Sequence, residues 1–214
     1  MAVVHRTTLR PTKLELLAAW LPTRPWYSGT GGPEPVDAGG FRLDDPEGEV
    51  GIEFKIVTDP SGTYLVPLTY RGAPLDGAEH ALVGTMEHGV LGRRWVYDGC
   101  HDPVLVAQLL ALIEGRVEAQ AQSVSDTPDR EVTRSHTGGG LAAADFATAT
   151  DDREGTAVHG PPGTTLRLHR VLRPSPDGPS PDGPPEATGH VAGSWRTPDG
   201  ARATGTFAVL RTVP

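Results

Sequence analysis

The chain has little of several residue types, and each shortage excludes a class of protein. Its 214 residues include one cysteine, Cys100, so no disulfide can form within the chain, and a lone thiol is typical of a reducing cytoplasm. Lysine occurs only at Lys13 and Lys55, and the net charge of −8 disfavours binding to nucleic acid. No stretch reaches the ~20 apolar residues of a membrane span. We therefore expect a cytoplasmic protein that binds neither nucleic acid nor membrane.

The first apolar stretch, residues 14–21, follows several basic residues and could be mistaken for a secretion signal. Glu15 interrupts the stretch, and no small-residue cleavage site follows it. Thr12 and Glu15 have the spacing of a capping box, in which each side chain bonds the other residue's backbone N–H. The sequence therefore predicts an amphipathic helix over residues 13–21, stopped by Pro22.

Two neighbouring segments alternate apolar and polar residues, which is the pattern of strands with one buried face. They run over residues 48–58 and 63–70, and the sequence Asp-Pro-Ser-Gly at 59–62 is typical of a turn. We expect an antiparallel hairpin, with Pro67 at an edge position or a bulge. The residues before it, 28–40, are rich in glycine and proline and are expected to form a loop.

A second helix is predicted to begin at Asp102-Pro103, because aspartate caps helix N-termini and proline favours the first helical position. Its apolar stripe continues to about Ala121 and is broad enough to lie against a sheet. The composition then shifts toward Ser, Thr, Asp, Gly and Ala, so residues 127–152 are interpreted as a linker of weak structure. Further short strands are expected at 93–97, 164–172, 193–196 and 204–213.

Motifs for catalysis or metal binding are weak. Residues 160–163, Gly-Pro-Pro-Gly, look like the opening of a phosphate-binding loop. Thr165 and Leu166 then stand where a lysine and a hydroxyl are needed, so a hairpin turn is favoured. His80 and His88 each follow a glutamate, but their spacing fits no compact zinc pattern, so no metal site is predicted.

Six segments within the first 126 residues follow the order of a known family: 12–17, 26–27, 50–54, 64–70, 91–99 and 101–103. They resemble the N-terminal cap domain of actinobacterial maltokinases and related aminosugar kinases. The resemblance implies a cystatin-like cap, in which a curved antiparallel sheet packs on a helix. It also implies a link to maltose, trehalose or glycogen metabolism.

The remainder resembles the small lobe of the same kinases more faintly. Residues 166–172 fall at the strand that bears the nucleotide-binding lysine, and Arg167 occupies the place of that lysine. Arginine is planar and bulkier than lysine, so it is a poor substitute for a compact ammonium at phosphates. The chain stops at Pro214, near where a kinase would enter its hinge, so we expect no catalytic lobe and no enzyme activity.

Together these observations predict an α+β fold in three parts. Residues 1–126 are expected to form the cap-like domain, a curved antiparallel sheet packed on a helix. Residues 127–152 are the linker, and residues 153–214 a small β-rich part similar to a kinase small lobe. Within that last part, residues 174–185 repeat Pro-Ser-Pro-Asp-Gly and are expected to be disordered.

Two functions follow from the resemblance. The first is a non-catalytic binding or regulatory protein without a cofactor, which acts through a protein partner or self-association. The second is a degenerate or split kinase subunit that binds ATP and magnesium, with Arg167 at the nucleotide position, and needs a partner chain. Arg24, Trp26 and Tyr27 are candidates for a protein-binding face, because Trp and Tyr recur at interface hot spots. The alternative for Trp26 is a place in the core.

Overall fold

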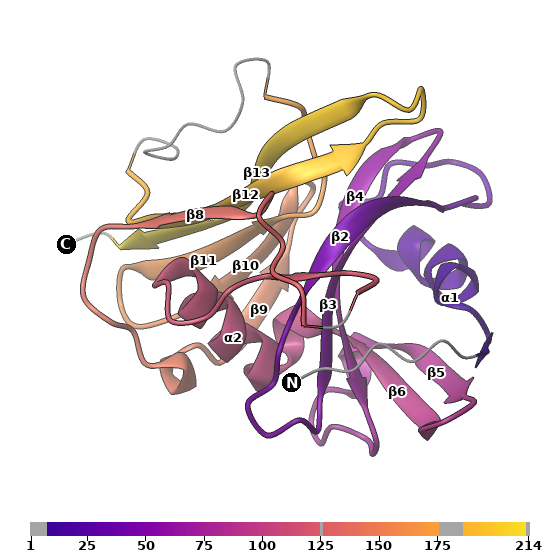
Figure 1. Ribbon diagram of the computed structural model, residues 1–214, viewed down its shortest axis with the longest axis horizontal. Helices are drawn as coiled ribbons and strands as arrows, with labels where there is room; N and C mark the ends of the chain where they lie inside the picture. The colour runs from indigo at the N-terminus through magenta and orange to yellow at the C-terminus, as the bar shows by residue number, and fades with distance from the viewer. Residues whose placement is uncertain (1–7, 125, 176–185, 213–214) are drawn as a thin grey trace.

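The structure, a computed structural model, describes residues 8–124, 126–175 and 186–212, and in these its strands form two antiparallel sheets (Figure 1). The first sheet has seven strands in the order β1-β5-β6-β4-β3-β2-β7. The second has six strands in the order β8-β12-β13-β11-β10-β9. With two short α-helices beside these sheets, the predicted α+β class is confirmed.

The strands of the first sheet are β1 (Leu9–Arg10), β2 (Val36–Leu43), β3 (Gly51–Asp59), β4 (Gly62–Arg71), β5 (Leu82–His88), β6 (Gly92–Asp98) and β7 (Gln120–Ala121). Those of the second are β8 (Thr133–His136), β9 (Thr148–Asp151), β10 (Gly155–His159), β11 (Thr164–His169), β12 (Gly189–Arg196) and β13 (Arg202–Thr212). The helices are α1 (Lys13–Trp20), α2 (Pro103–Ile113) and the 3-10 turns η1 (Leu21–Thr23), η2 (Glu79–Ala81), η3 (Gly99–His101) and η4 (Ala143–Asp145).

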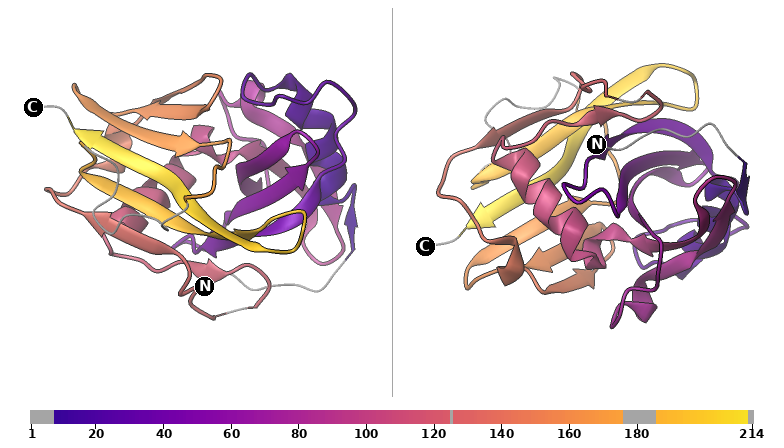
Figure 2. Two further views of the ribbon diagram at one scale, coloured as in Figure 1. Left: turned by 90° about the horizontal axis from the view of Figure 1, so that it is seen from above. Right: turned by 60° about the horizontal axis from the view of Figure 1, so that its bottom comes forward.

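The first sheet curls like half of a barrel, and each of its faces is covered (Figure 2). On one face α1 packs through Leu17 and Trp20 against Val57, Val66 and other residues of β3 to β6. On the other face the sheet meets α2 and the second sheet in one continuous apolar cluster. This double covering explains why every residue of β3 after its first is buried.

Helix α2 joins the two sheets into one core. Its Leu105, Leu109 and Leu112 share a cluster with Phe54 of the first sheet and Phe207 of the second. Figure 2 shows the helix running between the two sets of strands. Because apolar burial is worth roughly 25 cal/mol per Å², a shared core of this kind couples the stability of the two sheets.

The predicted first helix and first hairpin are confirmed. Thr12 caps α1 by accepting from the Glu15 backbone, and Glu15 reciprocates, so both halves of the capping box are present. Strands β3 and β4 pair in register from Gly51 with Tyr70 to Asp59 with Gly62. Pro67 lies just before the ladder of β4 with β6 begins at Leu68, so its missing N–H interrupts no pairing on that side.

The predicted end of the second helix is wrong. The helix stops at Ile113, eight residues before Ala121, although its apolar pattern continues. Gly115 adopts a φ of +75°, and the Arg116 N–H bonds back to the Ala111 carbonyl at 2.8 Å, which closes the helix as a Schellman-type cap does. The backbone conformation of one glycine thus overrides the side-chain periodicity.

Two predicted loops contain more structure than their composition suggested. Residues 28–40, expected as a loop, include the start of β2, and residues 127–152, expected as a linker, include β8 and β9 at the two edges of the second sheet. Small polar residues form these edge strands because pairing with a neighbouring strand supplies the backbone hydrogen bonds. Most of the repeat loop 174–185 lies outside the described residues. Neither α-helix in the described part of the chain is long and apolar enough to cross a membrane.

Candidate functional site

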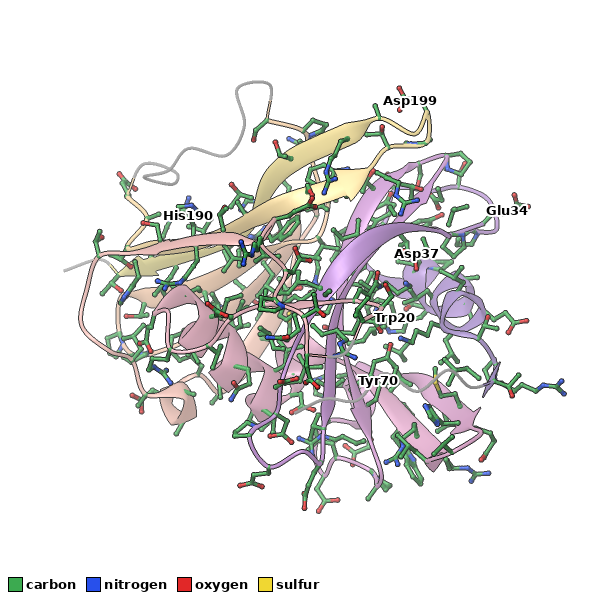
Figure 3. The ribbon with its side chains drawn as sticks, viewed as in Figure 1. Trp20, Glu34, Asp37, Tyr70, His190 and Asp199 are labelled. Carbon is green, nitrogen blue, oxygen red and sulfur yellow. The ribbon has the colours of Figure 1, made fainter. Side chains whose placement is uncertain are left out.

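A pocket of about 380 Å³ opens on the face of the first sheet that carries α1. Strands β1 to β6 and the first turn of α1 contribute its walls. This volume falls within the ~300–1,000 Å³ typical of small-molecule sites. In Figure 3 the labelled Tyr70, one of the lining residues, lies among the strands of the first sheet, below Trp20 of α1.

Strand register places the polar groups of the pocket on one face. Tyr70 pairs with Gly51 on one side and with Val96 on the other, and Met86 pairs with Arg94. Directly paired residues of antiparallel strands point to the same side of a sheet. Since Met86 and Val96 pack with α1, Tyr70 and Arg94 lie on the α1 face as well.

Glu53 forms the charged floor of the pocket and is almost fully buried. Its Oε2 lies 2.5 Å from Lys13 Nζ and accepts from the Tyr70 hydroxyl at 2.6 Å, while Oε1 accepts from Gln122 Nε2 at 2.9 Å. Burial opposes its ionisation, but the charges of Lys13 and Lys55 and these hydrogen bonds outweigh burial and lower the pKa of Glu53 to about 2. The floor is therefore an ionised carboxylate whose oxygens are already engaged.

Tyr70 and Lys13 complete this polar group. Burial, followed by the charge of Glu53, raises the pKa of Tyr70, so its phenol stays protonated and donates to the carboxylate. Lys13 Nζ also lies 5.0 Å from the centre of the Tyr70 ring, a cation–π distance. The three side chains hold one another in place, so this part of the pocket is preorganised.

The lining of the pocket, all of it in the described part of the chain, lacks a hydroxyl or thiol that is free to act as a nucleophile. Among the described residues that line the pocket there is no serine, threonine or cysteine, and the Tyr70 hydroxyl is committed to Glu53. A nucleophile of the Ser or Cys type, with its activating base, therefore has no place here. What the lining offers is hydrogen-bond donors beside apolar side chains, which is the composition of a ligand site.

Arg167, the residue at the nucleotide-lysine position, lies elsewhere. It is on β11 of the second sheet and does not line the pocket. Its two terminal nitrogens donate to the two oxygens of Asp152, Nη1 at 2.5 Å and Nη2 at 2.6 Å. This bidentate pair is the strongest geometry available to an arginine and a carboxylate, so an incoming phosphate has to compete with Asp152.

The three residues predicted to face a partner differ in exposure. Trp26 is 1% exposed and packs between Trp20 and Tyr64, with ring centres 5.7 and 5.9 Å away, so it lies in the core. Tyr27 is half-buried and donates to Asp59 at 2.6 Å. Arg24 is half-buried as well and stacks on Trp20. Contact with a partner stays a prediction for Arg24 and Tyr27, whereas Trp26 has almost no surface to offer.

A buried ion pair, which no local sequence pattern predicts, joins the two sheets. Arg170, which follows β11, donates through Nη2 to both oxygens of Asp98, at 2.5 and 2.6 Å, and through Nε to Thr156 at 2.8 Å. Arg170 Nη2 also lies 3.2 Å from the sulfur of Cys100, and burial raises the pKa of that thiol. Cys100 therefore stays a neutral thiol.

The histidines near α2 form a local contact. His80 Nε2 lies 3.0 Å from His101 Nδ1, and the two rings meet edge to face. Within the described residues no group of three or more His, Cys, Asp or Glu side chains is arranged to hold a metal ion. Burial lowers the pKa of His101, which favours its neutral form as one partner of this hydrogen bond.

Comparison with known proteins agrees with the resemblance described above for the first part of the chain. A search of curated proteins found no match to this sequence. A family model does match it, from Trp20 at the end of α1 to Asp102, the N-cap of α2. This stretch includes β2 to β6, and so most of the strands that form the pocket. Residues 20–102 of this chain match the maltokinase N-terminal cap domain.

Proposed function

We propose that the protein is a non-catalytic binding or regulatory protein of α-glucan metabolism, related to maltokinase through its cap-like region. The match of residues 20–102 to the cap domain supports the relation. The observation that carries the non-catalytic part is the bidentate pair of Arg167 with Asp152. A group that binds nucleotide phosphates needs open donors, and this guanidinium already donates from both terminal nitrogens.

The proposal also covers the family relation of the second sheet, the metabolic pathway and the cellular location of the protein. The hairpins of residues 153–214 support a relation to a kinase small lobe, and the curved sheet with its helices supports a cystatin-like cap. The link to maltose, trehalose or glycogen, the actinobacterial relation and a cytoplasmic location belong to the same proposal. The buried, single cysteine supports that location.

Calorimetric titration of the purified full chain with ATP and magnesium tests the non-catalytic role. We expect no binding heat up to millimolar nucleotide. Micromolar binding that disappears in Arg167→Ala but persists in Arg173→Ala would instead establish the degenerate kinase subunit. Arg173 is the matched control, because it is an exposed arginine near the same strand with only a 3.3 Å contact to Glu154.

We propose further that the protein acts through a protein partner or through its own second copy. Arg24 and Tyr27 support this, since they follow η1 beside a glycine-rich loop and keep part of their surface exposed. Tyrosine and arginine are enriched at interface hot spots, where they supply large contact areas. Affinity capture of the tagged chain from its own cells is expected to enrich enzymes that act on α-glucans, or the untagged chain itself.

The matched variants for that capture are Tyr27→Ala and Val36→Ala. Tyr27→Ala is expected to lower the captured amount, whereas Val36→Ala removes a similarly surface-placed apolar group at the start of β2 and is expected to leave it unchanged. Capture that is equal for both variants would remove the Arg24–Tyr27 face from the proposal. Enrichment of neither class of protein would contradict the α-glucan link.

A further inference from the structure

The pocket holds one arginine whose charge no described carboxylate neutralises. Lys13, the other cation that touches the floor, is paired with Glu53 at 2.5 Å. Arg94 on β6 lines the same pocket, yet it makes no ion pair with any residue that the structure describes. Its Nε is buried and has no hydrogen-bond partner. The Arg94 side chain as a whole is half-buried, so its charge is partly removed from water with no described carboxylate paired to it. An anionic ligand that supplies an acceptor to the terminal nitrogens, rather than to the enclosed Nε, is therefore favoured.

The guanidinium of Arg94 is held in place rather than swinging in solvent. Its Nη2 donates to the Leu91 carbonyl at 2.8 Å, across the turn between β5 and β6. Its Nη1 lies against Gly72, where an added Cβ would come within 2.8 Å of it. A donor that is fixed before binding loses little conformational entropy when a ligand arrives.

The carboxylates near the pocket are occupied, with one exception. Both oxygens of Asp45 accept backbone N–H groups, those of Glu47, Glu49 and Val50, at 2.9 to 3.1 Å. Glu53 is engaged as described above. Glu49 alone is an exposed carboxylate in the lining. Apart from Glu49, the charged groups of the pocket with spare hydrogen-bonding capacity are therefore donors, Arg94 and the two remaining N–H groups of Lys13.

Apolar side chains surround these donors. Leu9, Met86 and Leu91 line the pocket. Leu91 is 46% exposed, so the apolar wall continues to the rim. A ligand that fits both features has an acceptor-rich, negatively charged head and an apolar body.

We propose that this pocket binds a small organic oxyanion, a carboxylate or phosphate whose head lies between Arg94 and Lys13 and whose body lies against Met86 and Leu91. The inference deepens the proposed function, because it rests on the cap-like region being a binding module. The head accepts charge-assisted hydrogen bonds from the guanidinium and the ammonium. The apolar body gains from leaving water.

The test is a titration of the full chain with phenyl phosphate, benzoate and the neutral benzyl alcohol, followed by ligand-detected NMR. We expect binding of one or both anions and none of the alcohol at equal concentration. The two anions distinguish a phosphate head from a carboxylate head. Binding of benzyl alcohol as tight as that of both anions would overturn the proposal. So would a Kd above about 10 mM for both anions, which corresponds to a binding free energy weaker than ~3 kcal/mol.

Neighbouring arginines on β6 supply the matched variants. Arg94→Gln is expected to weaken anion binding by about tenfold, the loss of roughly one charge-assisted hydrogen bond. Arg93→Gln, which removes an exposed arginine paired with Glu87, is expected to change it by less than about twofold, as surface charges are screened. Arg94→Lys keeps the charge and is expected to retain most of the binding. Equal losses in Arg93→Gln and Arg94→Gln would contradict a specific role for Arg94.

Removing the carboxylate of Glu49 is expected to change the affinity for anions in the opposite direction, toward tighter binding. Glu49→Gln takes away a like charge and is expected to tighten phenyl phosphate binding severalfold. Circular dichroism of each variant confirms that it is folded. Binding of ATP that depends on Arg167 would sink the proposed function and leave this pocket untouched. Weaker or unchanged anion binding in Glu49→Gln would count against the pocket alone.

Discussion

The two sheets each present arginine side chains, but they use them in opposite ways. On the first sheet Arg94 lines a pocket without a carboxylate partner among the described residues. On the second sheet Arg167 donates from both terminal nitrogens to the two oxygens of Asp152. An arginine at a nucleotide-lysine position therefore does not by itself predict a binding site. What decides is whether a neighbouring acidic side chain has already taken its donors.

The largest expected loss of stability comes from replacing a third arginine, Arg170, which is buried between the two sheets. Arg170→Met leaves the Asp98 carboxylate buried without its partner, and removing one member of a buried pair costs about 3–5 kcal/mol. Urea unfolding followed by circular dichroism measures this loss. Because the pair joins the sheets, both are expected to lose stability together. A loss below about 1 kcal/mol would show that the pair does not hold the sheets to each other.

Trp26 tests whether the face beside α1 is core or contact surface. Trp26→Ala is expected to cost about 3–5 kcal/mol, since the ring is 1% exposed and fills space between Trp20 and Tyr64. A denaturant melt of the variant gives the value. Folding that stays nearly intact, with weaker capture of a partner, would return Trp26 to the protein-binding face.

The pH dependence of the free energy of unfolding tests whether Glu53, the floor of the pocket, is ionised and paired. The pKa of Glu53 is lowered to about 2 in the folded protein, below the ordinary 4.5 of the unfolded chain. The stabilisation is therefore complete above about pH 4.5 and is lost as the pH falls toward 2. Its size is about 3 kcal/mol by linkage, because one pKa unit corresponds to ~1.4 kcal/mol.

Urea melts between pH 6 and pH 2.5 measure this effect as a difference between the wild type and Glu53→Gln. The wild type is expected to lose more stability over this range than the variant, whose amide does not titrate. Identical slopes in the two proteins would mean that Glu53 has an ordinary pKa and that its contacts with Lys13 and Tyr70 are not maintained in solution.

The sequence predicted the elements whose signals are local. The hairpin of β3 and β4 follows from strict alternation around a turn, and the starts of α1 and α2 follow from Thr12 and Asp102 as caps. The start of strand β2 was not predicted because its glycines, Gly39 and Gly40, are typical of a loop. A side chain at Gly40 would come within 2.2 Å of the Phe54 carbonyl, so glycine is required in this strand although glycine is rare in strands.

The candidate site was harder to predict than the fold. Its polar side chains come from elements far apart in sequence, and only the register of four strands brings Glu53, Tyr70 and Arg94 to one face. Nothing local in the sequence distinguishes Arg94 from Arg93, its exposed neighbour. The resemblance to kinases directed attention to Arg167, where the fold supplies Asp152 from the turn between β9 and β10.

The smallest expected effect on stability concerns Arg167, which is paired with Asp152. Arg167→Met is expected to change the free energy of unfolding by less than about 1 kcal/mol, because the Asp152 side chain is 56% exposed and surface pairs contribute little. The same urea melt as for Arg170→Met measures it, so the two variants form a pair. A loss as large as that of Arg170→Met would show that the Arg167–Asp152 pair is structural in a way its exposure does not suggest.

The central claim, that ligand binding belongs to the first sheet and not to the arginine of β11, is tested most directly by amide NMR. The labelled protein is titrated in turn with phenyl phosphate and with ATP and magnesium. We expect phenyl phosphate to shift the amide signals around Lys13, Gly51 and Arg94, and ATP to leave those of Asp152 and Arg167 unmoved. Shifts that gather at Asp152 and Arg167, with the pocket residues unchanged, would contradict it.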